Sequence, residues 1–106
     1  MEHKHIVYTD PRTGVMGLYG TLRHVNEEYV NEQLSKAREY LTRCYETEAE
    51  IHDVITSVRI SKPPKQYHVS IRAFNRHIET KVLAYSARDA RKKAEHEIIG
   101  LKVEVS

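Results

Sequence analysis

The residue set that comes closest to a catalytic pattern is Glu79-Thr80-Lys81, with Asp53 upstream. Two acids and a lysine can hold Mg²⁺ and position an attacking water, as in metal-dependent nucleases. Alternation along a strand puts Glu79 and Lys81 on one face. An E-x-K triplet is common by chance, however, and a cross-strand charge pair explains it as well. We therefore predict no enzyme activity and no cofactor, and keep a metal-dependent nuclease as a distant third hypothesis.

The strongest chemical signal is positive charge between residues 59 and 93. This stretch has ten Lys or Arg and only two acids, whereas residues 1–58 have six basic and ten acidic residues. The chain as a whole is near neutral, at +2, but polarised. Such asymmetry indicates a polyanionic partner, through the summed electrostatic field and counterion release.

The candidate binding residues lie on a hairpin and a helix expected within the basic stretch. The predicted basic face consists of Arg72, Arg76, Lys81, Arg88, Arg91, Lys92 and Lys93. Phe74 and Tyr85 alternate onto the same strand face as Arg72 and Lys81, where rings would stack on bases and cations would hold phosphates. Alternatively, these aromatic residues pack under the N-terminal helix and the charges form a solvated rim.

Tyrosine is the dominant aromatic residue, with seven copies against one Phe and no Trp. It favours half-buried positions and protein interfaces because it joins a large apolar area to a polar tip. Tyr29 and Tyr40 are eleven residues apart, so a helix would place them on nearly the same side. Together with Arg43 they are candidate anchors for a protein partner, although rim residues of an ordinary core would look the same.

The histidines and the single cysteine show no spacing typical of a metal site, and we predict none. Cys44 ends an apolar helical stripe, which predicts a buried, reduced residue and a cytoplasmic location. No apolar run approaches the roughly 20 residues of a membrane helix, so we expect no membrane partner.

The N-terminal part predicts a hairpin followed by a long helix. Strands are expected at His5 to Thr9 and Val15 to Leu22, with a turn at residues 10–14 between them. Gly17 and Gly20 indicate a bulge or a close backbone approach in the second strand.

Asn26 is expected to cap a helix of about 20 residues. The stripe Val30, Leu34, Ala37, Leu41 and Cys44 favours packing in the core over a dimer seam, because it spans fewer than three heptads. Residues 51–61 fit both helical and strand spacing. The β-branched run before Pro63-Pro64 favours a strand.

The C-terminal part predicts a second hairpin and helix. Residues 67–73 and 78–84 alternate around a turn at 75–77, with one apolar face. Ser86 and Asp89 form a capping box for a helix with the buried stripe Ala87, Ala90, Ala94 and Ile98. We expect Gly100 to end this helix and Leu101 to Val105 to form a last strand.

The predicted fold is α+β, in ββαβ-ββαβ order, with two helices on one face of an antiparallel-rich sheet. We expect a single domain, residues 1–106. Its N-terminal part, 1–61, holds a hairpin, the long helix and a strand. Its C-terminal part, 66–106, holds the basic hairpin, a helix and a strand.

Residues 67–97 carry a short motif, "V-x-A-x-S" followed by "DA-x-x-x-A". Its members are Val82, Ala84, Ser86, Asp89, Ala90 and Ala94. The segment resembles the strand–strand–helix module of small phage and plasmid proteins of the DpnD/PcfM-like kind. The match covers under a third of the chain and transfers no functional residues. The resemblance implies an origin in a phage or mobile element.

These observations predict a small non-enzymatic binding module that modulates a macromolecule by protein–protein interaction. A host or phage protein is the expected partner, and the chain is expected to be a monomer or homodimer. Nucleic-acid binding through residues 59–93 is the alternative.

Overall fold

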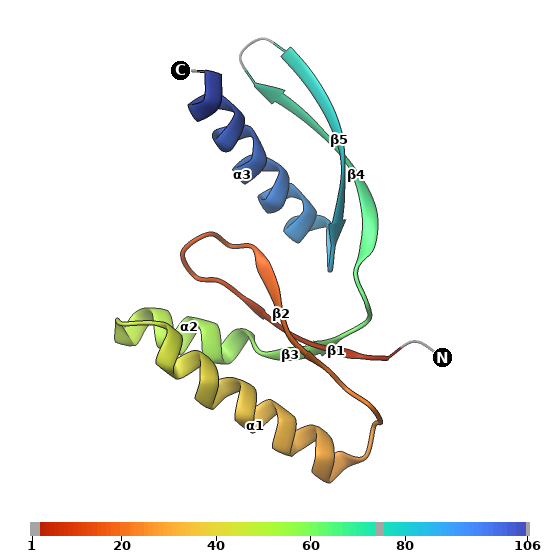
Figure 1. Cartoon of the computed structure of the whole chain (residues 1–106), viewed down its shortest axis with the longest axis vertical. Helices are drawn as coiled ribbons and strands as arrows, with labels where there is room; N and C mark the ends of the chain where they lie inside the picture. Colours follow the sequence, from red (N-terminus) through yellow and green to blue (C-terminus); the bar gives the residue numbers. More distant parts are fainter. Residues whose placement is uncertain (1–2, 74–75, 106) are drawn as a thin grey trace. The chain divides into compact units, whose positions relative to one another are not determined.

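The computed structural model describes the backbone of residues 3–73 and 76–105, and the side chains of these residues except 71, 73, 76, 78 and 97–105. Within the described part the fold is α+β, with five antiparallel strands in two sheets and three helices in ββααβββα order (Figure 1). The predicted α+β class is confirmed, whereas the prediction of one sheet with two helices is wrong. The chain divides into two compact units, Met1–Pro63 and Pro64–Ser106.

The first unit begins with a β-hairpin of β1 (His5–Thr9) and β2 (Met16–Thr21). Its loop closes through hydrogen bonds from the Asp10 amide to the Val15 carbonyl (2.9 Å) and from the Gly14 amide to the Asp10 carbonyl (2.8 Å). Gly14 has a φ of 75°, a left-handed conformation that glycine adopts without steric cost. The predicted turn and both predicted strands are confirmed.

A third strand, β3 (Arg59–Ser61), pairs with the other edge of β1 and gives the sheet order β2-β1-β3. The β1–β2 register shifts between Ile6 and Val7, because Ile6 pairs with Gly20 while Val7 pairs with Leu18. Tyr19 is therefore the extra residue of a bulge, which confirms the irregularity predicted in this strand.

The long helix α1 (Glu27–Cys44) starts as predicted. The Asn26 side chain accepts hydrogen bonds from the amides of Glu28 (3.0 Å) and Tyr29 (3.2 Å). Along the predicted stripe, Ala37 and Leu41 are buried, which confirms packing in the core. Cys44 is exposed, so its predicted burial is wrong. Cys44 is the last residue of α1, at the end of the stripe.

The strand predicted over residues 51–61 is wrong for most of its length. Glu48–Ser57 form the helix α2, and only residues 59–61 are extended. Thr47 caps α2, because its hydroxyl accepts from the Glu50 amide (3.2 Å) and donates to the Glu50 carboxylate (2.9 Å). This capping box starts a helix, and the helical spacing then buries Val54.

Helices α1 and α2 lie together on one face of the three-stranded sheet (Figure 1). They bury a single apolar cluster against it. Its buried members are Ile6, Leu22, Ala37, Leu41, Val54 and Val58.

The second unit starts with a hairpin of β4 (Lys65–Ala73) and β5 (Arg76–Ala84). The register pairs Ala73 with Arg76, so the turn predicted at 75–77 is wrong for residues 76 and 77, which are in β5. Side chains alternate as predicted. Tyr67, Val69, Thr80 and Val82 are half-buried and Ala84 is buried, whereas His68, Ser70, Arg72, His77, Glu79, Lys81 and Leu83 are exposed.

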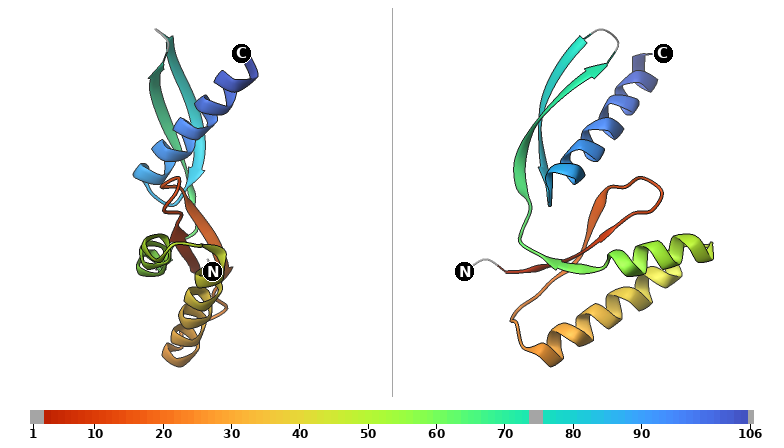
Figure 2. Two further views of the ribbon diagram at one scale, coloured as in Figure 1. Left: turned by 90° about the vertical axis from the view of Figure 1, so that its left-hand side faces the viewer. Right: turned by 180° about the vertical axis from the view of Figure 1, so that it is seen from behind.

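Helix α3 (Ala87–Val105) follows β5 and packs mainly against it, with fewer contacts to β4. Two further views show α3 running along the hairpin (Figure 2). Ala90 and Ala94 are fully buried, as predicted, but Ala87 is exposed and the Ile98 side chain lies outside the described residues.

The predicted helix end at Gly100 and the predicted last strand are wrong, because the backbone stays helical to Val105. Glycine inside a helix costs only about 1 kcal/mol. A helix also satisfies its own backbone hydrogen bonds, whereas an isolated strand needs a partner.

Candidate binding sites

The first unit has a cleft of about 380 Å³ between the β1–β2 hairpin and the C-terminal end of α1. Four tyrosines line it together with one leucine from each side and the exposed thiol. The lining residues are Tyr8, Leu18, Tyr19, Tyr40, Leu41, Cys44 and Tyr45. Leu18 and Tyr40 are 49% and 51% exposed, so the cleft opens to solvent between an aliphatic and an aromatic wall. The volume falls within the range of small-ligand pockets, at its lower end.

The aromatic walls are held in place by local contacts. The rings of Tyr19 and Tyr40 have centroids 5.7 Å apart and are inclined by 59°, a favourable tilted pair. Tyr19 reaches this position from the β2 bulge. The Cys44 thiol donates a hydrogen bond to the Tyr40 carbonyl (3.4 Å), one turn back along α1.

Arg12 ties the hairpin loop to the junction of α1 and α2. Its guanidinium pairs with the Glu50 carboxylate and lies over the ring of Tyr45, 5.3 Å from the centroid. The cation–π contact covers one face of a ring that lines the cleft. Glu50 is itself fixed by the capping box with Thr47, so the position of Arg12 is set by the start of α2.

These contacts shift the titration of the groups involved. Hydrogen bonds from Arg12 and then Thr47 lower the pKa of Glu50 from 4.5 to about 2. Burial, followed by a hydrogen bond with Asp10, raises the pKa of Tyr45 from 10.0 to about 12. The pKa of the Tyr40 phenol is also raised, mainly by its interaction with the Cys44 side chain. Both phenols are therefore neutral hydrogen-bonding groups at physiological pH.

The two predicted tyrosine anchors have different surroundings. Tyr40 is half-exposed and lines the cleft, whereas Tyr29 packs against the core at the other end of α1. The Tyr29 ring lies 4.0 Å from that of His24, and its hydroxyl accepts from the Arg23 amide (3.4 Å). A separation of eleven residues is roughly 16 Å along a helix, so the two tyrosines do not form one site. Arg43 pairs with Glu39 at 3.1 Å.

The second unit carries the predicted basic residues on two surfaces. Arg72 and Lys81 are exposed on the hairpin face opposite to the half-buried set, and no ion pair of theirs is found among the described residues. Phe74 lies outside the described residues, as does the side chain of Arg76. The structure therefore describes Arg72 and Lys81 of the predicted base-stacking surface, but not Phe74.

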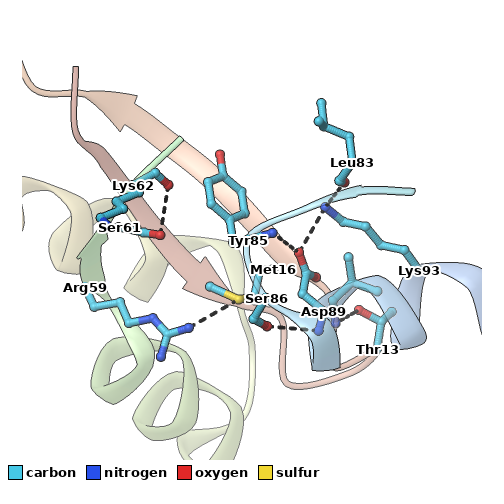
Figure 3. A network of polar contacts seen from close by, with 11 residues as sticks. Thr13, Met16, Arg59, Ser61, Lys62, Leu83, Tyr85, Ser86, Asp89 and Lys93 are labelled. Atoms are coloured by element: carbon cyan, nitrogen blue, oxygen red, sulfur yellow. Dashed lines mark hydrogen bonds and ion pairs between the residues drawn. The ribbon is translucent and has the colours of Figure 1, made fainter. Parts of the chain in front are cut away.

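The described basic residues of α3 differ in their contacts. Arg88 and Arg91 are exposed, and Lys92 makes a long ion pair with Glu95 (3.8 Å). Lys93 pairs with the buried Asp89 (3.1 Å) and donates to the Leu83 carbonyl (3.2 Å), as Figure 3 shows. Its position is thus fixed within the fold.

Tyr85 is half-buried beneath Lys93, whose ammonium lies 5.6 Å from the ring centroid. Burial raises the Tyr85 pKa. Its amide donates to the Asp89 carboxylate (3.0 Å), while the Asp89 amide donates to the Ser86 hydroxyl (3.1 Å) (Figure 3). The predicted capping box is confirmed, except that Asp89 accepts from Tyr85, one residue before the cap. Tyr85 is not an open stacking surface.

Ser70, His77 and Glu79 form a cluster on the open hairpin face that has the residue types of a hydrolytic triad. His77 Nε2 lies 2.9 Å from Ser70 Oγ and 3.4 Å from a Glu79 oxygen, so one nitrogen faces both groups. A triad needs the two groups on different ring nitrogens. His68 also contacts Glu79, at 3.6 Å. The cluster is a surface hydrogen-bond network.

Glu79 and Lys81 share this face, as predicted, whereas Asp53 lies on α2 of the first unit. Across the part of the chain that the structure describes, no three His, Cys, Asp or Glu side chains are grouped closely enough to hold a metal ion. None of the described helices has the length and apolar character needed to cross a membrane.

The chain matches no protein-family model, and comparisons with curated proteins and with solved structures gave no match. The resemblance of residues 67–97 to DpnD/PcfM-like modules stays a prediction. Tyr8, Tyr19 and Tyr45 are cleft residues that the sequence analysis missed. The abundance of tyrosine was a signal for them, but no spacing connects residues 8, 19 and 45.

Proposed function

We propose that this protein is a binding module that recognises another protein by taking one of its basic side chains, arginine before lysine, into the tyrosine cleft. The observation that carries the proposal is the cleft itself, with four tyrosines around a volume of about 380 Å³ that opens to solvent. That volume is large enough to admit one long side chain.

Arginine is the favoured ligand side chain because the faces of tyrosine rings attract guanidinium groups. The chain itself contains one such cation–π contact. Arg12 lies over Tyr45 on the same unit. The first unit also has ten acids against eight basic residues, so its charge favours a cationic partner. Neutral phenols at Tyr40 and Tyr45 supply acceptors for the guanidinium N–H groups.

Nuclear magnetic resonance titration with short blocked peptides tests the proposal. A Gly-Arg-Gly peptide should shift the signals of Tyr19 and Tyr40, and a Gly-Leu-Gly peptide of the same length should shift them less. The Tyr40→Ala variant should lose the response. Leu83→Ala is the matched control, because Leu83 is a similarly exposed apolar residue on the other unit.

Equal shifts with both peptides, or an unchanged response in Tyr40→Ala, would contradict the proposal. Preference for the leucine peptide would retain a protein-binding cleft but replace the basic guest by an apolar one.

Nucleic-acid binding through the second unit is the second candidate, favoured by the exposed Arg72 and Lys81. Against it, Glu79 lies on the same hairpin face, and Arg88 and Arg91 belong to α3, which packs on the opposite face. Fluorescence anisotropy with labelled single- and double-stranded DNA and RNA decides it. Phosphate contacts predict binding that weakens steeply with salt and is lost in the double variant Arg72→Glu, Lys81→Glu.

A further inference from the structure

Among the residues that the structure describes, the second sheet contains β4 and β5 alone, so the nine-residue outer edge of β4 has no neighbouring strand there. Two-stranded sheets are marginally stable, and an unpaired edge offers a row of free amides and carbonyls to a further strand. On the outer edge of β5, two backbone groups near the C-terminal end of the strand already have partners. Lys93 holds the Leu83 carbonyl, and Asp89 holds the Tyr85 amide just beyond the strand.

The side chains of β4 also leave its apolar side incompletely covered. Tyr67 and Val69 are only half-buried, and α3 packs mainly against β5. A strand added beside β4 would cover these two residues. It would also form hydrogen bonds with the outward amides and carbonyls of β4.

The hairpin register identifies which residues present those groups. Ala73 and Arg76 close the hairpin, and such a closing pair is hydrogen-bonded across the two strands. Pairs then alternate, so the amides and carbonyls of β4 that point away from β5 belong to Gln66, His68, Ser70 and Arg72. The bond from Lys93 to Leu83, the partner of Gln66, agrees with this assignment.

We propose that the occupant of the β4 edge is the β4 strand of a second copy of this chain, antiparallel and centred on Val69. This register uses the whole strand, because Lys65 then pairs with Ala73 of the copy. On the open face it pairs Gln66 with Arg72 and His68 with Ser70, so no two basic side chains lie opposite each other.

Shifting the centre by one residue produces less favourable registers. Centring on His68 places two histidines opposite each other, and centring on Ser70 places His68 opposite Arg72. The register centred on Val69 forms a four-stranded sheet in which Tyr67 and Val69 of both copies meet on the side that carries α3.

Sedimentation equilibrium of the full chain tests the association. We expect a mass twice that of the 12.4 kDa chain, and dissociation of this dimer to the monomer on dilution. Ser70→Pro removes an outward amide and should raise the dissociation constant about 30-fold or more. Glu79→Pro is the matched control, because Glu79 is the cross-strand partner of Ser70 on the β5 edge, and it should leave the dissociation constant unchanged.

A cysteine at the two-fold axis provides a second test that does not depend on proline. In a Cys44→Ser background, Val69→Cys should form an intermolecular disulfide on mild oxidation, because residues paired across the axis would have Cα atoms about 4.5 Å apart. Val82→Cys, half-buried on the same face of β5, should not. A monomer at every concentration, a dimer insensitive to Ser70→Pro, or equal crosslinking at both positions would overturn the proposal.

Discussion

Tyr8 and Gly17 face each other across the β1–β2 pair, and the ring of Tyr8 fills the space that a side chain at position 17 would need. A Cβ atom on Gly17 would lie 2.6 Å from Tyr8 Cζ and 2.7 Å from its hydroxyl oxygen. Since Tyr8 lines the cleft, the absence of a side chain at Gly17 sets the position of one cleft wall.

Gly17→Ala should therefore destabilise the protein by about 1–3 kcal/mol, because the added methyl group forces the Tyr8 ring to move. Urea denaturation measures the change. Gly20→Ala is the matched control on the same strand, where a Cβ would meet no atom within 4 Å. We expect it to be neutral or stabilising by about 0.5–1 kcal/mol, through the lower chain entropy of alanine. Equal effects of the two substitutions would show that the Tyr8 contact does not matter.

Acid should weaken the fold through Glu50. Its pKa is lowered by the hydrogen bonds from Arg12 and Thr47, to about 2 from 4.5, so the ionised form is favoured in the folded state. The contribution of ionised Glu50 to the free energy of unfolding is fully present above pH 4.5 and is lost as the pH falls from there through about 2. Glu50→Gln should flatten that part of the stability–pH curve, measured by urea denaturation at a series of pH values. A variant curve with the same slope as the parent would contradict the assignment.

Alkaline pH should weaken the fold through Tyr45. Burial and the hydrogen bond with Asp10 raise its pKa from 10.0 to about 12, so the neutral phenol is favoured in the folded state. The contribution is present below pH 10 and is lost as the pH rises through about 12. Ultraviolet titration should show a late-ionising step that is smaller by one tyrosine in Tyr45→Phe, since the pKa values of Tyr40 and Tyr85 are raised as well. The late step should persist in Tyr67→Phe.

Asp89 should be the most sensitive polar position of the second unit. It is 1% exposed, accepts from the Tyr85 amide and pairs with Lys93. Asp89→Ala leaves these donors without their acceptor and should cost about 2–4 kcal/mol. Ser86→Ala loses only the helix cap and should cost about 1 kcal/mol.

Hydrogen exchange resolves where that stability is lost. Protection in β4, β5 and α3 should fall in Asp89→Ala and much less in Ser86→Ala. A comparable loss in both variants would mean that the cap, rather than the buried carboxylate, stabilises this unit.

Local chemistry explains which elements were predicted correctly. The turn at residues 10–14, the Asn26 cap and the Ser86 cap depend on neighbours within about four residues. Each pattern specifies its own geometry, because the interacting groups are already close along the chain. The helical cap at Thr47 was equally local, and its capping box with Glu50 was the signal missed when residues 51–61 were assigned to a strand.

Long-range pairing explains what could not be predicted. The split into two sheets depends on which strand edges meet, and β3 joins β1 across more than fifty residues. The cleft likewise joins Tyr8 and Tyr19 to Tyr40 and Tyr45, which come together only when α1 packs on the hairpin.

The sequence by itself determined the two hairpins, the starts of α1 and α3 and the concentration of positive charge in residues 59–93, because caps, turns and alternation act over a few residues. Only the tertiary structure decided that the tyrosines line a cleft, that Lys93 and Asp89 have structural positions and that one hairpin face is open. These features depend on packing between distant segments, and packing depends on shape and burial that no local pattern encodes.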